Sequence, residues 1–476
     1  MPDIRYVCIS DMHLGEEDSV LTCLKEGTWN IDWSQASPTL SRLVECMRFL
    51  IKKNETKTKP TLILMGDILE FALATDSEAA MGFERFIELI MPKSKKMFDR
   101  IFFVPGNHDH HLWESARETQ YVEHIMTKTP GTELDTPWHT TNMFLEDEAP
   151  LTNYFLTRLV QRYPHLKRFV IGTAYPNFGL ITPDKQKCVI FHHGHYVESM
   201  YHLMTFLKSK LFPERPKPEI IWEIEGENFA WIDFFWSMAG RSGEVGKDME
   251  IIYEKMTNPD KLKEFLYERA EVIAEYEDIP GIPTDTLEKM FLKGVALWLY
   301  EKLSAGERAR REKALDAEAE QGLKEYLAKP LKAQLEGELK GPPPAEVTFV
   351  FGHTHKPFEG LWQFEGYPSW THVYNTGGWV VDTEEAAPVM GGSVVLLDEH
   401  LNAVSMRMYN EAAKEAEYSV RLAVPNDGGH PVENPLYMRL QDLFDPTKDP
   451  WTSFSKAVAK DVAYREGKER LRGKPR

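Results

Sequence analysis

Five short stretches place metal-ligating and acid–base side chains directly after a short apolar run. They are "DMH" after "YVCIS", "GD" after "TLILM", "GNHD" after "IFFVP", "HHGH" after "CVIF", and "GHTH" after "VTFVF". Each stretch alone is weak, because such tripeptides occur by chance and a single exposed histidine is more often solvated than a ligand. Together they supply oxygen and nitrogen donors without a thiolate. The donors are Asp11, His13, Asp67, Asn107, His193, His353 and His355.

This donor set suits two metal ions with open positions better than one closed structural site. It favours Mn²⁺, with Fe, Zn, Co or Ni as further candidates. Two ions about 3.5–4 Å apart need a carboxylate between them, and such pairs activate a water or hydroxide for in-line attack on phosphorus. The predicted reaction is the hydrolysis of a phosphoester or pyrophosphate bond.

The apolar runs before these clusters are too short for ordinary helices and suit strands that are buried on both faces. Helical patterns over 40–51 and 78–98 separate the first three runs. This βαβαβ order predicts a mostly parallel sheet. Ligands gather at the carboxyl ends of such strands, which is where all five clusters fall.

The later part of the chain predicts a second, partly antiparallel sheet. "FGLITPDKQKCVIF" and "GGSVVLLDEHLNAVSMRMY" each indicate a pair of strands. The long segment between them is helical by pattern, with candidate helices over 258–276 and 306–327.

These boundaries divide the chain into a core, two insertions and an extension. We expect a catalytic core over 1–195 and 346–410, with a smaller insertion at about 125–167. A helical cap is expected over 196–345, and a C-terminal extension with a basic tail over 411–476. The tail is interpreted as a solvated, disordered arm, with weak contact to an anionic surface as the alternative.

In this order, "DMH", "GD", "GNHD", "HGH" and "GHTH" resemble the signature of the calcineurin-like metallophosphoesterases. The resemblance covers the N-terminal 120 residues, 168–195 and 346–410. It implies an α/β fold, a two-sheet β-sandwich flanked by helices, here with a large helical insertion that acts as a cap. Carried over residue by residue, it implies a first metal held by Asp11, His13 and His355, a second held by Asn107, His193 and His353, and a bridging Asp67.

The same resemblance makes His108 the catalytic group and not a ligand. His108 would protonate the leaving oxygen or stabilise the developing charge, and Asp109 would orient its imidazole through the other ring nitrogen. Such a pairing raises the pKa of a histidine, which suits an acid near neutral pH.

Several neighbouring side chains keep more than one interpretation. His110 and His111 are outer-shell partners or local polar contacts. His192 and His195 flank His193, and either replaces it if the register shifts; His195 otherwise touches the substrate phosphate. Successive side chains on a strand alternate faces, so His192 and His193 cannot both enter one site. We interpret Glu70 as an outer-shell or helix-start carboxylate, and Asn375 as a substrate or outer-shell contact.

Within the family, "GDILEF", "HGH" and "GHTHKP" followed by "YNTGGWV" resemble the group that contains the bacterial UDP-2,3-diacylglucosamine pyrophosphatases. This implies a small phosphorylated substrate that is lipid-linked or nucleotide-linked. The chain departs from the group at His108, where arginine is typical, at Gly378, where aspartate is typical, and in its greater length.

The cap segments "YHLMTFLKSKLF" and "NFAWIDFFWSMAG" are rich in large apolar residues. They suit a channel for an acyl chain or a patch on a membrane surface, but a core for the insertion itself is the favoured interpretation. Peripheral membrane contact therefore stays open.

Two alternative functions stand beside the lipid-linked or nucleotide-linked phosphoesterase. One is a nucleotide or nucleic-acid phosphodiesterase, and the other is a non-catalytic scaffold with this fold. A scaffold tends to lose ligands, whereas here every expected position is filled. With 56 Lys and Arg against 74 Asp and Glu, the net charge of −18 disfavours long nucleic acid but not nucleotides.

Composition indicates a folded protein of a reducing compartment. The chain has 476 residues, of which 42% are hydrophobic, and four scattered cysteines without paired spacing. The N-terminus shows no leader pattern, and no apolar run reaches the length of a bilayer span. These features predict a cytoplasmic protein, and they leave its oligomeric state open.

Overall fold

The computed structural model describes residues 2–145, 151–197, 199–233, 237, 313–381, 384–427, 430–431 and 433–472. Its strands are β1 Tyr6–Ile9, β2 Thr61–Met65, β3 Arg100–Val104, β4 Leu151–Thr152, β5 Gly172–Thr173, β6 Asn177–Ile181, β7 Lys187–His192, β8 Glu346–Phe351, β9 Phe358–Trp362, β10 Thr371–Asn375, β11 Gly391–Leu397, β12 Ala403–Asn410, β13 Arg421–Ala423, β14 Asn426–Asp427 and β15 His430–Pro431.

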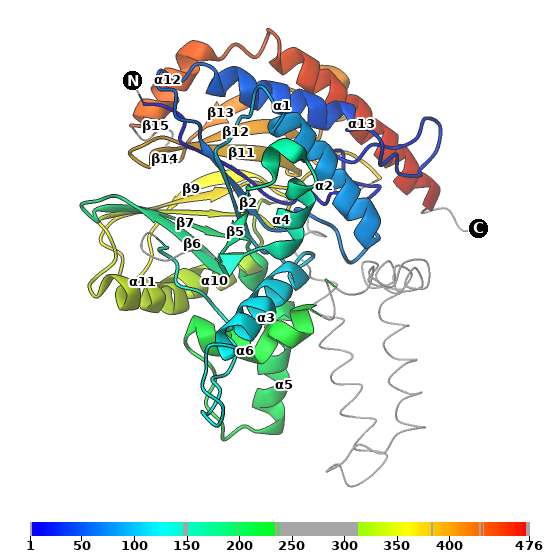
Figure 1. The fold of residues 1–476 in the computed structure, drawn as a ribbon. Coiled ribbons are helices and arrows are strands. Elements are labelled where there is room, and N and C mark those ends of the chain that lie inside the picture. The colour runs from blue at the N-terminus through cyan, green and yellow to red at the C-terminus, as the bar shows by residue number, and fades with distance from the viewer. Residues whose placement is uncertain are drawn as a thin grey trace, which may run out of the picture.

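The main α-helices lie around these strands (Figure 1). They are α1 Pro38–Ile51, α2 Asp76–Ile90, α3 His111–Ile125, α4 Tyr154–Gln161, α5 Leu203–Leu211, α6 Ile221–Ile232, α10 Ala317–Tyr326, α11 Lys332–Leu339, α12 Pro435–Leu443 and α13 Trp451–Arg472.

Two sheets form the centre of the molecule. The larger has the order β13-β12-β11-β1-β2-β3-β5-β4, and the smaller has the order β6-β7-β8-β10-β9. Strands β1, β2, β3 and β5 run parallel, as do β7, β8 and β10. The predicted two-sheet α/β fold flanked by helices is therefore confirmed. Both predicted hairpins form, but β11 and β12 extend the larger sheet and not the second one.

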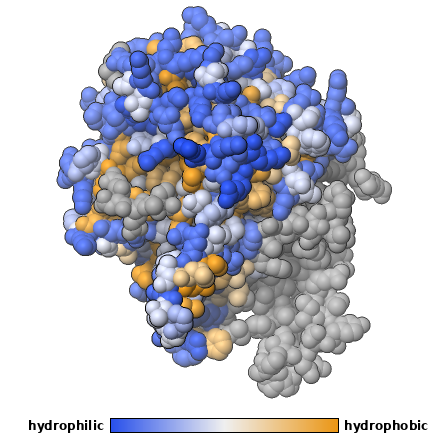
Figure 2. Space-filling model, in the orientation of Figure 1, coloured by the Kyte–Doolittle hydropathy of each residue, from blue (hydrophilic) through white to orange (hydrophobic). Residues whose placement is uncertain are grey.

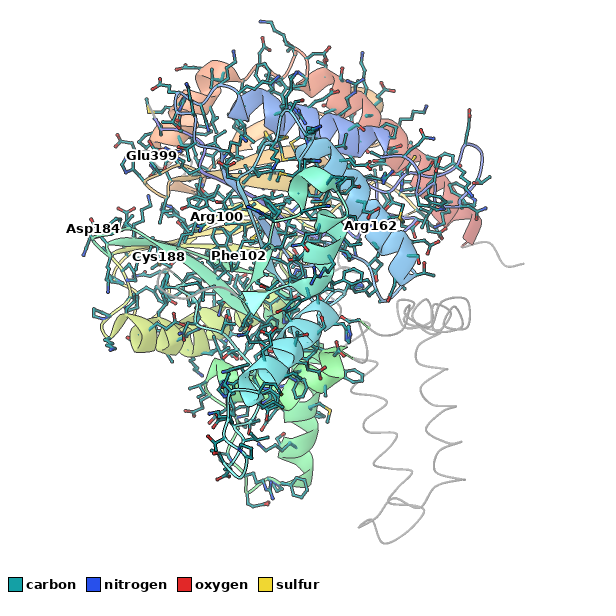
Figure 3. The ribbon with its side chains drawn as sticks, viewed as in Figure 1. Arg100, Phe102, Arg162, Asp184, Cys188 and Glu399 are labelled. Carbon is teal, nitrogen blue, oxygen red and sulfur yellow. The ribbon has the colours of Figure 1, made fainter. Side chains whose placement is uncertain are left out.

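Apolar side chains from both sheets meet in a shared core, because each inner strand has a second apolar face to bury. Phe102 of β3, which is labelled in Figure 3, stacks on Phe178 of β6 with 4.0 Å between ring centroids. Cys8 and Val104 of the larger sheet belong to the same buried cluster as Val350 of the smaller one. Helices cover the outer faces, with α1, α2, α4, α12 and α13 on the larger sheet and α10 on the smaller.

Capping residues decide where the first two helices begin. Ser37 accepts a hydrogen bond from Leu40 N at the start of α1, and Thr75 forms a reciprocal capping box with Glu78 at the start of α2. Both predicted helices are present. The second is shorter than predicted, because Pro92 cannot continue it past Met91.

The C-terminal extension is part of the folded body, so the prediction of a disordered tail is wrong through Arg472. Helix α13 packs along α1 and buries Trp451, Phe454 and Val458 in the core of the larger sheet (Figure 1). Each such side chain contributes about 1.5–3 kcal/mol of burial. Among the described side chains of the tail, the basic residues Arg465 and Lys468 are buried, and Lys468 pairs with Glu17 and Asp18.

Parts of the two predicted insertions lie among the described residues. The segment at 125–167 supplies edge strand β4 and helix α4, whose Leu156 and Val160 are buried in the main core. Of the candidate helix at 306–327, residues 306–312 lie outside the described residues, 313–316 are not helical, and α10 begins at Ala317, where Asp316 caps it. The candidate helix at 258–276 lies outside the described residues.

In the face shown by Figure 2, hydrophilic side chains cover the upper region over α1, α12 and α13, and hydrophobic ones appear lower down on the lobe of α5 and α6. Exposed apolar side chains of that lobe include Met204, Phe212, Ile220 and Trp222. Among the helices of the described ranges, none combines the length and the apolar character needed to cross a bilayer. All four cysteines are free thiols.

Candidate metal centre

The predicted ligands all follow the carboxyl ends of strands. Asp11 and His13 follow β1, Asp67 follows β2 and Asn107 follows β3 in the larger sheet, and His193 comes directly after β7 in the smaller one. His353 and His355 follow β8 in the same way. Because the two sheets pack face to face, these ends meet, and the ligands come together from segments more than 300 residues apart.

The backbone is forced into an unusual conformation at these positions. Among the described residues, five of the eight non-glycine residues with positive φ angles are predicted ligands: Asp11, His13, Asp67, His353 and His355. Such residues cost on the order of 1–3 kcal/mol each and gather at functional sites. The sharp turns aim their side chains back across the strand ends.

The first donor set is Asp11, His13 and His355, whose ligand atoms lie within 4.8 Å of one another. His355 Nε2 is 3.2 Å from His13 Nε2 and 3.5 Å from Asp11 Oδ1. The carboxylate of Asp11 is also held by the backbone N–H of His353, at 2.9 and 3.0 Å. All three side chains are buried.

The second donor set is Asp67, His193 and His353, also within 4.8 Å, with Asn107 beside it. His193 Nε2 lies 3.1 Å from Asp67 Oδ2, 3.0 Å from Asn107 Oδ1 and 3.3 Å from His353 Nδ1. His193 Nδ1 is 3.0 Å from the carbonyl oxygen of Met65, which fixes the orientation of the ring.

Asp67 lies between the two sets. Its Oδ1 accepts the backbone N–H of His108 at 2.8 Å, and its Oδ2 is 3.7 Å from His13 Nε2 and 3.1 Å from His193 Nε2. Burial by itself raises the pKa of Asp67, but His193 and His108 hold it well below its ordinary value. One ionised oxygen therefore faces both donor sets, as a bridging ligand requires.

The chemistry of these atoms fits cations at both positions. His13 Nδ1 bonds a carboxylate and His193 Nδ1 bonds a carbonyl, so each neutral ring carries its proton on Nδ1 and turns a lone pair on Nε2 inward. These lone pairs meet carboxylate and amide oxygens, which are acceptors too. Acceptors converge this closely in a buried site only around a proton or a metal ion. Burial by itself lowers the pKa of His193, but the charges of Asp67 and Asp11 outweigh it and raise this pKa to about 9.

The orienting carboxylate of His108 is Glu70, which corrects the prediction for Asp109. Glu70 Oε1 lies 2.9 Å from His108 Nδ1, and Glu70 Oε2 lies 2.7 Å from His13 Nδ1. Glu70 is fully buried and also accepts the backbone N–H groups of Ala72 and Leu73, at 2.6 and 2.9 Å. Burial raises its pKa, but His108 and His13 outweigh this and lower it, so Glu70 is ionised.

Asp109 instead ties two loops together. Its Oδ1 accepts the N–H of Gly106 at 2.7 Å, and its Oδ2 accepts the N–H of Ile68 at 2.8 Å and that of Leu69 at 3.4 Å. The turn at His108 points the Asp109 side chain at the backbone of the loop after β2, away from the His108 ring. Glu70 belongs to that loop, and its side chain reaches the His108 ring instead. Burial, and next the charge of Asp67, raise the pKa of Asp109 to about 7.

The structure gives His192, His195 and Asn375 different positions relative to the two donor sets. His192 turns away from the donor sets and packs on Tyr326, with its Nδ1 accepting the N–H of Gly194 at 2.8 Å, as strand alternation requires. His195 stacks beside His193 with 5.6 Å between ring centroids. Asn375 is a loop-positioning residue, because it binds the Gly352 carbonyl and the Thr354 hydroxyl at 3.0 Å and accepts the Gly377 N–H at 2.7 Å.

His110 and His111 contact the inserted helix α6. His111 Nδ1 is 3.3 Å from both oxygens of Asp233, and His110 Nδ1 is 3.6 Å from Asp233 Oδ1. Ser237 donates to the carbonyl oxygen of Asn107 at 2.6 Å. Sequence reasoning missed these anchors, because nothing in the motif indicates which part of the insertion reaches the loop after β3.

Gly378 occupies the position where the resembling pyrophosphatase group carries aspartate. A Cβ atom there would lie 2.4 Å from the ring carbon Cδ2 of His355. The ring is one of the proposed ligands and cannot yield easily. The local arrangement around His355 therefore differs from one that accommodates an aspartate.

Comparison with known proteins agrees with this geometry. The profile of the calcineurin-like phosphoesterases matches residues 4–243, about half of the chain. No curated protein matches. Among solved structures, the chain is similar to a cold-active protein-tyrosine phosphatase of the psychrophile Shewanella sp., with 11% identity over 86% of this chain and 80% of that one, but the TM-score of 0.23 supports no argument. The match over residues 4–243 shows that the chain belongs to the calcineurin-like phosphoesterase family.

Proposed function

We propose that this protein is a two-metal-dependent phosphoesterase that hydrolyses an ester or pyrophosphate bond of a small phosphorylated substrate. The observation that carries the proposal is the position of Asp67, whose Oδ2 faces both donor sets while its Oδ1 holds the backbone of His108. A bridging carboxylate beside a buried imidazole is the arrangement that in-line displacement at phosphorus uses.

Seven side chains would hold the two ions: Asp11, His13 and His355 for one, Asn107, His193 and His353 for the other, and Asp67 for both. A pair of divalent ions at these positions, with Mn²⁺ favoured, would polarise the phosphoryl oxygens and make water a better nucleophile near neutral pH.

The acid in this proposal is His108, assisted by Glu70. As the water oxygen forms its bond to phosphorus and the ester P–O bond breaks, His108 gives a proton from Nε2 to the leaving oxygen. The ionised Glu70 stabilises the protonated ring through Nδ1 and keeps it in this orientation.

The substrate is proposed only by class. The family resemblance favours a lipid-linked or nucleotide-linked phosphate, and the alternative is a nucleotide phosphodiesterase. A net charge of −18 disfavours long nucleic acid. The space at Gly378, which leaves no room for the aspartate of the pyrophosphatase group, argues against a substrate site identical to that of this group.

The experiment is metal reconstitution followed by turnover. Chelator-treated protein is incubated with Mn²⁺, Zn²⁺, Co²⁺, Ni²⁺ or Fe²⁺, metal content is measured by mass spectrometry, and hydrolysis of p-nitrophenyl phosphate and its bis-ester is followed. We expect two ions per chain and turnover with at least Mn²⁺. Two bound ions without turnover under any of these metals would favour the scaffold, and an absence of bound metal would overturn the proposal.

A further inference from the structure

A second group of buried polar side chains lies next to the proposed metal centre. We call it the Glu225 cluster, and it consists of His110, Tyr175, His195, Tyr201 and Glu225. They come from the loop after β3, the loop after β5, the short helices at His195–Val197 and Ser199–His202, and α6. None of the five is more than 3% exposed. Of the five, His195 is the last residue of the "HGH" motif, and the other four lie outside the signature motifs as quoted above.

Aromatic contacts hold the cluster together. Tyr175 and His195 lie nearly parallel, with an interplanar angle of 10°, and the Tyr175 hydroxyl is 3.4 Å from His195 Nε2. The ring of Tyr201 is 4.8 Å from that of His195, and the ring of His110 is 5.2 Å from that of Tyr175. The side chains therefore form one continuous group and not separate buried residues.

The polar atoms of the cluster are poorly satisfied in the part of the chain that the structure describes. The hydroxyls of Tyr175 and Tyr201 face the carboxylate of Glu225 and lower its pKa, but among the described residues neither oxygen of Glu225 has a partner with good hydrogen-bond geometry. Within the described ranges, His195 Nδ1 has no hydrogen-bond partner, and the Tyr201 hydroxyl makes an imperfect contact with Glu225 but has no well-aligned partner. Folded proteins pair the great majority of buried polar groups, so these atoms need either ordered water or a ligand.

The position of the cluster favours a ligand. His195 stacks 5.6 Å from His193, which is a proposed metal ligand, and His110 lies two residues after His108 on the same loop. Ser237, which follows α6, binds the carbonyl oxygen of Asn107. The cluster is therefore adjacent to the metal centre, on the side where the chain that follows α6 contacts the loop after β3.

The chemistry of the cluster distinguishes among ligands. Glu114 lies close enough to affect Glu225, and the adjacent Arg117 is already held by Glu114 Oε2 at 2.6 and 2.8 Å. The carboxylates of Glu225 and Glu114 would repel a further phosphate group of the substrate, because the one nearby guanidinium named here, that of Arg117, is already paired. An acyl chain would leave the polar atoms unpaired. Hydroxyl groups both donate to a carboxylate and accept from tyrosine and imidazole.

We propose that the Glu225 cluster binds the alcohol part of the substrate, and that this part is a polyhydroxylated group such as a sugar or glycerol. The proposal rests on the proposed function, since it assigns the remainder of a phosphoester whose phosphate lies at the metal centre. It deepens that function by naming what the phosphate is attached to.

The test compares two phosphomonoesters that share a carbon chain, glycerol 1-phosphate and propyl phosphate, with the Mn²⁺-loaded full-length enzyme. A site built to bind hydroxyls discriminates strongly against an analogue that lacks them. We expect kcat/KM to be at least about tenfold higher for glycerol 1-phosphate. In Glu225→Gln and in Tyr201→Phe this ratio should fall toward one, mainly through KM. Glu223→Gln, an exposed position of the same helix, is the matched control and should keep the wild-type ratio.

The outcomes separate the two proposals. If wild-type enzyme hydrolyses neither ester nor p-nitrophenyl phosphate, the proposed function fails. If it hydrolyses both esters equally, or if neither variant moves the ratio, only the assignment of the cluster is overturned, and ordered water satisfies these atoms. A preference for ethanolamine phosphate over glycerol 1-phosphate would overturn the hydroxyl assignment in favour of a cationic ligand. If Glu225→Gln does not fold, Tyr201→Phe still decides the result.

Discussion

The metal centre and the Glu225 cluster are both buried and polar, yet their hydrogen bonding differs. At the metal centre the outer nitrogens of His13 and His193 are held by Glu70 and by the Met65 carbonyl. In the Glu225 cluster, both oxygens of Glu225 and Nδ1 of His195 lack well-aligned partners among the residues that the structure describes. At the metal centre, surrounding groups fix the orientation of the ligand rings, and the inner nitrogen and oxygen atoms point toward positions suited to cations. The Glu225 cluster presents unsatisfied atoms.

The difference also separates the two by origin. Every proposed metal ligand comes from a strand end of the two sheets, where short stiff turns fix each side chain. The Glu225 cluster combines loops of those sheets with α6 of the insertion. On the two proposals above, the family core would supply the reaction chemistry and the insertion would supply contacts that select the substrate. Five changes would break or sharpen this comparison.

Replacing the bridging residue should have the largest effect. We expect Asp67→Ala to lose bound metal and to lower kcat by more than the ~10²–10⁴-fold that a general acid contributes, because it removes the oxygen shared by both donor sets. Mass spectrometry of the metal content checks this. Asp67→Ala protein that keeps two ions would contradict the bridging role.

Replacing the acid should lower the rate without removing metal. We expect His108→Ala to keep both ions and to lose about 10²–10⁴-fold in kcat. The loss should be smaller for p-nitrophenyl esters, whose leaving group needs little protonation. If His108→Ala emptied a metal position, the division of roles between His108 and the ligands would be wrong.

Replacing the carboxylate that orients His108 should have an intermediate effect. Glu70→Gln can accept from only one of the two imidazoles, so we expect a loss of about 10–100-fold in activity or metal affinity. Because the pKa of Glu70 is lowered, its contribution to stability is present above the ordinary glutamate value of 4.5 and is lost as the pH falls below it.

Asp109→Asn is the comparison for this variant. Asp109 bonds only backbone N–H groups among the contacts described above, and asparagine keeps one acceptor oxygen. A larger loss of activity in Asp109→Asn than in Glu70→Gln, with wild-type unfolding temperatures for both, would restore Asp109 as the orienting residue.

Weakening the contact between insertion and core should have a smaller effect. Asp233→Ala removes the partner of His111 and His110, and we expect kcat to fall about tenfold as the loop after β3 loses an anchor. Glu227→Ala, on the same helix but bonded to Thr205 and Lys208, is the control. Equal activity of the two variants would mean that the insertion does not position the loop.

The smallest expected effect is on stability. Burial raises the pKa of Glu225 to about 7, above the ordinary value of 4.5. Below pH 4.5 Glu225 is protonated in both the folded and the unfolded state, so it does not destabilise the fold. Between pH 4.5 and about 7 it ionises readily only in the unfolded state, so the free energy of unfolding falls as the pH rises. The groups that face Glu225 are His110, Glu114, Tyr175 and Tyr201.

Glutamine does not ionise, so the unfolding temperature of Glu225→Gln minus that of the wild type should increase by about 2 °C or more between pH 4.5 and 7 and then level off. Thermal unfolding across pH measures it, with Glu223→Gln as the flat reference. A pH-independent difference would show that the Glu225 carboxylate already has a full set of partners.

Much of the molecule could be predicted from sequence because its signals are local. Short apolar runs that end in polar clusters predicted the parallel strands, and the caps at Ser37 and Thr75 agree with the first two helices. Errors arose where a local signal was outweighed. The C-terminal helix looks solvated by charge, but its apolar residues Trp451 and Phe454 bury against α1 and the larger sheet. The resemblance assigns the orienting role to Asp109, but its side chain binds the backbone of Gly106 and Ile68 instead.

The sequence alone determined the family, the parallel strands that precede the first three motifs and the types of donor available for metal. These follow from residue type, spacing and strand alternation, which act over a few positions. Tertiary packing decided which carboxylate orients His108, that Asp67 Oδ2 faces both donor sets, and that Glu225 of the insertion lies beside Tyr175 and Tyr201. Such contacts depend on how separate segments pack. A shift of about 1 Å is enough to break one hydrogen bond and form another, and no sequence pattern specifies positions that finely.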